Sequence, residues 1–282
     1  MNTKSFFSFM LCSIGLLAHN TEGWANTWTQ KATAPFSAFG ASGFTVGNKA
    51  YVYIGDGNVF WEYDQISDSW NQRALFPGIP RVQAVGFSIG DKGYISTGNS
   101  MTSFLVNYKD TWEYDTVTNT WTQRADFGGA PRCQAVGFSI GTKGYVGTGK
   151  VTDLGIACSN ARNDFWEYDP VSDTWTEKAP VGGGGRLAAA GFSLGNKGYI
   201  GSGSTDCNLL PVPGTTDGLR DFWEYDPAYD AWSLKAEIPG VPRKSAVGFS
   251  LGAYGFIGGG TDRTVPILPS MGFDAPQSDL WR

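Results

Sequence analysis

Histidine is nearly absent from this chain of 282 residues, and its one histidine, His19, lies near the start. The first 25 residues have the features of a secretion signal: Lys4, then an apolar run from Phe6 to Ala18 and the small-residue pattern Gly23-Trp24-Ala25. Cleavage before Asn26 would leave a mature chain without histidine. Hydrolysis by a Ser-His-Asp triad and zinc chemistry at histidine ligands would then lack their base or their ligand.

The apolar run is too short to cross a membrane, because a spanning helix needs about 20 residues. Leu11 precedes Cys12, where a lipoprotein signal would have a small residue. We therefore expect residues 1–25 to be a cleaved signal peptide and residues 26–282 to be a single domain. The protein would be secreted or periplasmic, of bacterial type, and not inserted in a membrane. An uncleaved anchor is the alternative.

Cysteine and basic charge are also scarce. The chain has four cysteines and no Cys-x-x-Cys motif, so we expect neither a zinc site nor another cofactor. The formal net charge is −5 and no basic stripe is present, so we expect no nucleic-acid partner. Cys158 and Cys207 fall in equivalent loops of neighbouring repeats and could form a disulfide in an oxidising compartment. Cys133 would remain a small buried residue.

No stretch of the chain sustains the 3.6-residue apolar period of an amphipathic helix. Instead, the chain has 39 glycines, and aromatic residues make up 15% of it. This composition favours short strands joined by tight turns. The sequence therefore predicts an all-β fold.

A two-part aromatic unit recurs five times along the chain. One part is a pentapeptide that begins with Trp, at residues 28–32, 70–74, 121–125, 175–179 and 232–236. The other part begins with a Gly-Phe pair, at Gly43-Phe44, Gly86-Phe87, Gly137-Phe138, Gly191-Phe192 and Gly248-Phe249. Successive pairs lie 43 to 57 residues apart. A period of this length indicates radial or solenoid repetition.

The best-preserved unit predicts four antiparallel strands. Residues 135–141 and 144–149 alternate their side chains on either side of a two-residue turn, as in a hairpin. Residues 164–169 form the third strand, and Pro170-Val-Ser-Asp173 turns the chain into the fourth strand, residues 174–178. Four such strands make one blade of a propeller.

The strands at the two ends of the chain are parts of incomplete repeats that complement each other. The mature chain would begin with a lone fourth strand, residues 28–32, and the last unit reaches its third strand at residues 279–282. Pairing these strands would complete a fifth four-stranded blade, close the ring and remove exposed sheet edges. The alternative is a shortened six-bladed propeller that stays open or is completed by a partner.

Several features give the chain a resemblance to a known family. They are glycine-rich paired strands, a Tyr-Asp pair and a Trp six residues beyond that Asp. This last spacing occurs at Asp64 and Trp70, Asp115 and Trp121, Asp169 and Trp175, and Asp226 and Trp232. The chain resembles the kelch-repeat β-propellers, and in particular looks like secreted bacterial members. It departs from the usual glycine doublet after the second strand, although Gly258-Gly259-Gly260 comes close. The resemblance implies the fold and leaves the activity open.

In each expected blade, the entry to strand one and the loop between strands two and three share one face, which we call the loop face. Its long loops carry apolar residues, and we predict that they bind a protein or glycan partner. These candidates are Phe104, Leu105, Leu209, Leu210, Ile267, Leu268 and Phe273. The alternative is that they pack over the channel mouth.

Four arginines are in register on the same face, each six residues before the Phe of strand one. They are Arg81, Arg132, Arg186 and Arg243. The first blade breaks the series with Ala38. Convergent guanidinium groups could bind a carboxylate or an acidic sugar. The alternative is structural, with each arginine bonding carbonyls of its own or the neighbouring blade.

Two functions are consistent with these patterns, and both leave the oligomeric state open. The first is a non-catalytic secreted module that binds a protein or glycan on the loop face, and the missing histidine favours it. The second is implied by the resemblance, because some periplasmic kelch propellers interconvert sialic acid anomers. In that sugar-acid mutarotase, the arginines would hold the carboxylate and a channel carboxylate would move the proton. Glu62, Glu113, Glu167 and Glu224 recur once per blade beside Trp, which indicates a scaffold role for them.

Overall fold

The computed structural model describes residues 29–103, 106–151, 160–205, 218–262 and 275–282. Residues 1–31 and residues 32–282 form separate units, and the described strands belong to the second unit. In its described part the regular structure is β-strand, apart from one 3-10 turn at Asp56–Asn58. None of the described residues forms a helix that is both long and apolar enough to span a membrane.

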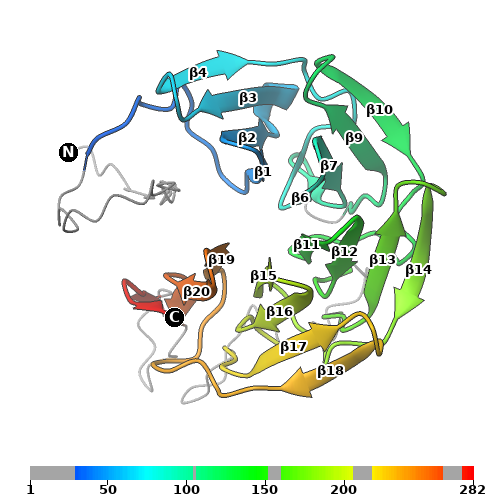
Figure 1. The fold of residues 1–282 in the computed structure, drawn as a ribbon, viewed down its shortest axis with the longest axis vertical. Coiled ribbons are helices and arrows are strands. Elements are labelled where there is room, and N and C mark those ends of the chain that lie inside the picture. The colour runs from blue at the N-terminus through cyan, green and yellow to red at the C-terminus, as the bar shows by residue number, and fades with distance from the viewer. Residues whose placement is uncertain (1–28, 104–105, 152–159, 206–217, 263–274) are drawn as a thin grey trace. The chain divides into compact units, whose positions relative to one another are not determined.

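Five antiparallel sheets follow one another along the chain, and each is one blade (Figure 1). Blade 1 has β1 (Ser42–Val46), β2 (Lys49–Ile54), β3 (Val59–Asp64) and β4 (Ser69–Gln72). Blade 2 has β6 (Val85–Ile89), β7 (Lys92–Ser96), β9 (Thr111–Asp115) and β10 (Thr120–Arg124). Blade 3 has β11 (Val136–Ile140), β12 (Lys143–Gly147), β13 (Phe165–Asp169) and β14 (Thr174–Lys178). Blade 4 has β15 (Ala190–Leu194), β16 (Lys197–Gly201), β17 (Phe222–Asp226) and β18 (Ala231–Leu234).

Blade 5 has three described strands, β19 (Val247–Leu251), β20 (Tyr254–Gly258) and β23 (Leu280–Trp281). Two short ladders join loop segments, β5 (Arg81–Val82) with β8 (Asn99–Ser100) and β21 (Thr261–Asp262) with β22 (Ala275–Pro276). The all-β propeller of five blades is therefore confirmed. Residues 29–34 carry no strand, so closure of the ring through residues 28–32 and 279–282 stays a prediction.

Neighbouring blades pack by inserting a phenylalanine ring of one blade above a glycine of the next. The glycines stand at the same register position of strand two, opposite a serine of strand one. A Cβ added to any of these glycines would lie within 2.5 Å of a ring carbon of the preceding blade. The distances are 1.9 Å for Gly93 and Phe44, 2.3 Å for Gly144 and Phe87, 2.5 Å for Gly198 and Phe138, and 2.4 Å for Gly255 and Phe192. Real Cβ atoms do not approach this closely, so glycine at these positions is required by the ring of the preceding blade.

A chain of backbone hydrogen bonds also links the blades where each inner strand begins. One backbone amide in each of blades 2 to 5 donates to the carbonyl of its counterpart in the preceding blade. The pairs and their N to O distances are Gln83 to Gly40, 2.8 Å; Gln134 to Gln83, 3.2 Å; Ala188 to Gln134, 3.0 Å; and Ser245 to Ala188, 2.8 Å. All five residues have φ between 51° and 62°, in the left-handed region that costs non-glycine residues energy. Each blade therefore bonds the next through a strained residue.

We predict that Gly144→Ala destabilises the protein. The new methyl group would overlap the ring of Phe87, and overpacking of this kind costs about 1–3 kcal/mol. Urea unfolding followed by tryptophan fluorescence measures the change. Val171→Ala is the control, because Val171 is 93% exposed and its truncation should change the free energy of unfolding by less than about 0.5 kcal/mol. An unchanged stability of Gly144→Ala would contradict the packing described above.

Candidate functional site

The four arginines in register are buried in ion pairs. Their exposed fractions are 0% for Arg81 and Arg186 and 1% for Arg132 and Arg243. Each guanidinium donates two hydrogen bonds to one carboxylate at the start of the third strand of its own blade. The partners are Asp110, Asp164, Asp221 and Asp279. For Arg132 and Asp164, both N to O distances are 2.6 Å.

The same guanidinium groups also hold the end of the second strand. Arg81 donates to the carbonyl of Thr97 at 3.0 Å and Arg132 to that of Thr148 at 2.9 Å. Both threonines have positive φ values, 63° and 61°, which are rare for a β-branched residue. This position corresponds to the first glycine of the doublet, which blade 5 keeps as Gly259. Each arginine thus ties together the first, second and third strands of one blade.

Blade 1 supports this structural role because it lacks both partners. Ala38 stands where the other blades have arginine, and Val59 stands where they have aspartate. Asn58 takes over part of the task by accepting from the hydroxyl of Tyr53 at 2.9 Å and donating to the carbonyl of Gly78 at 2.8 Å. The arginine and the aspartate are therefore present together or absent together.

The ligand-binding interpretation of Arg81, Arg132, Arg186 and Arg243 needs guanidinium groups that face the channel mouth. In the structure these groups are buried, paired with aspartate and bonded to carbonyls, so their charge is not presented to a ligand. The structural alternative fits this geometry. The aspartate partners were missed from the sequence, although the signal was there: an Asp two residues before Trp in the same four blades.

The electrostatics of the pair explain why it is stable. Burial alone would raise the pKa of Asp110 and Asp164, but the hydrogen bonds and charge of Arg81 and Arg132 outweigh burial. The pKa of both carboxyl groups therefore lies below its ordinary value, and both stay ionised at neutral pH.

The recurring glutamates form a second structural network. Tyr94 donates to Glu113 at 2.8 Å, and Arg124 donates to the same carboxylate at 2.8 Å. Equivalent contacts involve Glu62, Glu167 and Glu224. In blade 5 the tyrosine is replaced by Phe256, and Arg282 stands in the place of the glutamate. The hydroxyl is thus present only where its carboxylate partner is.

The apolar candidates on the loop face lie outside the described residues: Phe104, Leu105, Leu209, Leu210, Ile267, Leu268 and Phe273. Cys158 and Cys207 also lie outside them, so their pairing stays a prediction. Cys133 is fully buried and free, and burial raises the pKa of its thiol to about 11. In the described part of the chain no group of three or more His, Cys, Asp or Glu residues could hold a metal ion.

Other apolar side chains of blade 2 are described and exposed, although none of them is among the predicted candidates. Ile79, Met101 and Val106 are 57%, 37% and 46% exposed, and we call them the blade-2 patch. Ile79 and Met101 flank the paired residues Arg81 and Ser100, and the amide of Ser100 donates to the carbonyl of Val106 at 2.8 Å. The buried ion pair of Arg81 thus anchors the segments that present this patch.

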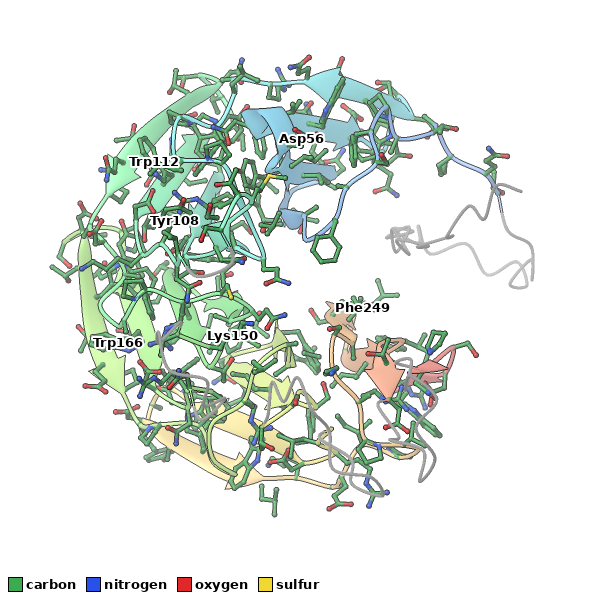
Figure 2. The ribbon with its side chains drawn as sticks, turned by 180° about the vertical axis from the view of Figure 1, so that it is seen from behind. Asp56, Tyr108, Trp112, Lys150, Trp166 and Phe249 are labelled. Atoms are coloured by element: carbon green, nitrogen blue, oxygen red, sulfur yellow. The ribbon has the colours of Figure 1, made fainter. Side chains whose placement is uncertain are left out.

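Lys150 is a second feature of the loop face that departs from the repeat. It stands where other blades have Asn99, Ser204 and Thr261, and its backbone bridges Cys133 and Ala161. Figure 2 shows Lys150 and Tyr108 among the side chains of blades 2 and 3. The neighbouring amide of Asn107 donates to the Lys150 carbonyl at 3.3 Å. A cation is therefore placed where the repeat itself does not require one.

Comparison with known proteins agrees with this architecture. N-acetylneuraminate epimerase of Yersinia enterocolitica is 28% identical over 211 residues, which are 70% of this chain and 45% of that protein. Kelch-like protein 25 of Xenopus tropicalis is 28% identical over 190 residues, which are 64% of this chain and 29% of that protein. The solved structure of YjhT matches with a TM-score of 0.66 at 16% identity, covering 89% of this chain and 96% of that one. No family model matches the sequence.

The chain belongs to the kelch-repeat β-propellers. It spans less than half the length of the curated relatives that it matches, and the likeness to YjhT at this identity shows the fold alone. In this kelch propeller, the residue at the first position of the kelch glycine doublet offers its carbonyl to the buried arginine. These residues are Thr97, Thr148, Ser202 and Gly259.

We predict that Arg132→Ala destabilises this propeller by about 3–5 kcal/mol, because it leaves the Asp164 carboxylate without its partner in a largely buried place. The matched control is Arg220→Ala. Arg220 and Glu237 form an ion pair whose side chains are 43% and 61% exposed, and such pairs contribute about 1 kcal/mol or less. Equal losses in urea unfolding for the two variants would argue against a structural role for Arg132.

The pairs also predict how stability depends on pH. Since folding lowers the pKa of Asp110 and Asp164, their contribution is present above the pKa of an unfolded aspartate. It is lost as the pH falls through the lower pKa of the folded state. We expect the free energy of unfolding to fall below about pH 4 and to fall less steeply in Asp164→Asn. Parallel pH profiles of the two proteins would refute this origin of acid sensitivity.

Proposed function

We propose that this kelch propeller is a non-catalytic binding module of an extracytoplasmic compartment, which holds a partner on its loop face. The observation that carries the proposal is the blade-2 patch, a group of exposed apolar side chains on segments anchored by a buried ion pair. Exposed apolar patches on rigid scaffolds mark interaction sites. Aliphatic side chains favour a protein over a glycan among the two expected partners.

The distribution of charge supports binding over catalysis. A general acid or base needs a titratable group whose pKa is shifted in a cleft and which is free to meet substrate. The carboxylates of the described residues whose pKa is lowered are in contact with arginine, lysine or backbone amides of their own blade. These contacts recur from blade to blade, as scaffold contacts do.

A sugar-acid mutarotase is the second candidate, and the relatives named N-acetylneuraminate epimerase favour it. The four buried arginines do not offer a cation to a sugar carboxylate in this geometry. Lys150 is one described cation on the loop face outside the repeated ion pairs, and the exposed Arg162, which bridges Arg186 through its backbone, is another.

The binding proposal is tested with the blade-2 patch. The double variant Ile79→Ser/Met101→Ser should lose at least about tenfold in affinity for proteins captured from an envelope extract of the source cells, while unfolding at the same urea concentration as the wild type. Val171→Ser is the control, since it removes an apolar side chain that is more exposed than Ile79 or Met101 from the turn between β13 and β14. Capture that is unaffected by the double variant would refute the patch as the binding surface.

The second candidate is tested by proton NMR on N-acetylneuraminate. The binding proposal expects the anomers to equilibrate at the rate of the buffer alone. Acceleration by the wild type, abolished in Lys150→Ala and kept in Arg132→Lys, would establish mutarotation and overturn the non-catalytic proposal.

A further inference from the structure

Blade 4 departs from the repeat just before its buried arginine. In blades 2, 3 and 5 the arginine follows a residue and a proline, and in blade 4 it follows two glycines. The pairs are Ile79-Pro80, Ala130-Pro131, Gly184-Gly185 and Val241-Pro242. Proline has no backbone N–H, whereas glycine has one and adopts positive φ easily. Blade 4 therefore gains a backbone donor and loses a conformational constraint here. We call residues 182–185, which are all glycine, the glycine turn.

The exchange of proline for glycine leaves one donor of the buried arginine without a partner. In the other three blades, Nε of the arginine donates to the carbonyl of the residue two positions earlier. The N to O distances are 3.0 Å for Arg81, 3.1 Å for Arg132 and 3.2 Å for Arg243. In blade 4 the equivalent carbonyl belongs to Gly184, whose φ is 87°. Nε of Arg186 is buried and has no hydrogen-bond partner among the described residues.

The backbone explains this difference. A residue before proline is held in the extended region, and there its carbonyl meets Nε of the arginine. Gly184 precedes glycine and has left that region, so its carbonyl no longer reaches Nε of Arg186. A buried donor without an acceptor costs stability. The glycine turn therefore has a donor that an acceptor from outside the repeat would satisfy.

The backbone N–H groups of Gly183, Gly184 and Gly185 add to these donors. None of them donates a hydrogen bond to another described residue. Gly183 and Gly184 are exposed, and a Cβ added to Gly184 would meet no atom within 4 Å. Their φ values are 75° and 87°, and successive N–H groups in such turns form concavities that bind anions. The turn is therefore open and rich in free donors.

The charges next to the glycine turn sum to a positive value. The carboxylate of Asp221 accepts two hydrogen bonds from Arg186 and one from the indole of Trp223, so this pair is balanced. Arg162 is exposed, and its carbonyl accepts from the amide of Arg186 at 3.1 Å. Residues opposite each other in an antiparallel pair carry their side chains on the same side. Arg162 therefore adds an unbalanced cation on the side of Arg186.

We propose that the glycine turn of blade 4 binds a phosphate group, as inorganic phosphate or as a phosphomonoester. A phosphate has more oxygens than a carboxylate, so it accepts from the glycine N–H groups and from the guanidinium of Arg162 together. Nε of Arg186 faces the turn and gains the acceptor that it lacks, while the ion pair with Asp221 stays intact. The site does not include the blade-2 patch, and the proposal does not depend on partner binding there.

Isothermal titration of the mature protein with inorganic phosphate, and separately with glycerol 3-phosphate, tests the proposal. Ionic strength is kept constant with chloride. We expect a dissociation constant of about 1 mM or tighter for at least one of the two probes. The preferred probe shows whether the site takes free phosphate or a monoester. Heats that equal those of the chloride control for both probes would overturn the proposal.

The double variant Gly184→Ala/Gly185→Pro gives blade 4 the sequence of blade 3. It removes the N–H of residue 185 and returns a carbonyl to Nε of Arg186. Binding should weaken at least about tenfold. Urea unfolding should occur at the same or a higher concentration, because proline restricts the unfolded chain.

Arg162→Ala is the second variant, and it changes an exposed side chain only. We expect it to weaken binding at least about fivefold. Lys109→Ala is the matched control, because Lys109 is a loop-face cation of blade 2 that is 46% exposed, and it should bind phosphate as the wild type does. Full binding by either the glycine variant or Arg162→Ala, or an equal loss in Lys109→Ala, would refute the site.

Discussion

The fold depends on a glycine in the second strand of a blade, because its missing side chain leaves space for an aromatic ring of the preceding blade. Phe44, Phe87, Phe138 and Phe192 each lie over a glycine that could not carry a Cβ. The ring then stacks on the tyrosine of its own second strand, as Phe87 does on Tyr94 with ring centroids 5.1 Å apart. Each aromatic side chain buried in this way removes about 150–250 Å² from water. Glycine weakens a strand taken alone, and here the packing between blades outweighs that cost.

The buried arginine holds the strands of one blade together, whereas the contact of phenylalanine with glycine holds neighbouring blades together. A buried ion pair stabilises little by itself, because taking two charges out of water costs nearly as much as their attraction returns. Its value here is geometric. One planar guanidinium satisfies an aspartate, a strained carbonyl and the entry to the inner strand together, so a blade with the wrong register would leave a charge buried without a partner. The co-occurrence of arginine and aspartate in blades 2 to 5, and the absence of both in blade 1, follows from this constraint.

Much of the scaffold could be predicted because each blade repeats the same strands and the same contacts. The Gly-Phe pairs and the Tyr-Asp pairs followed by Trp predicted the fold class, the number of blades and the hairpins. The role of Arg81 could not be fixed in the same way, since its position six residues before Phe87 is compatible with facing the channel or the blade. The distance to Asp110 decides it, and that distance depends on how three strands meet. Thr97 is harder still, because nothing in a threonine suggests a left-handed turn until the arginine that needs its carbonyl is in place.

Repetition itself separates scaffold from function in this molecule. A residue found in every blade is explained by a contact that every blade makes, as Glu113 and Tyr94 are. The informative positions are therefore the exceptions. In blade 5, Phe256 lacks the tyrosine hydroxyl and Arg282 lacks the carboxylate that would accept from it. The contacts within the blade therefore explain this exception. Ala50, which replaces the glycine of the other blades in the second strand of blade 1, and Lys150 have no such compensation in the described residues, and one lies in the packing surface of blade 1 while the other lies on the loop face. Departures from a repeat without an internal partner are therefore positions that the packing of the blades does not explain.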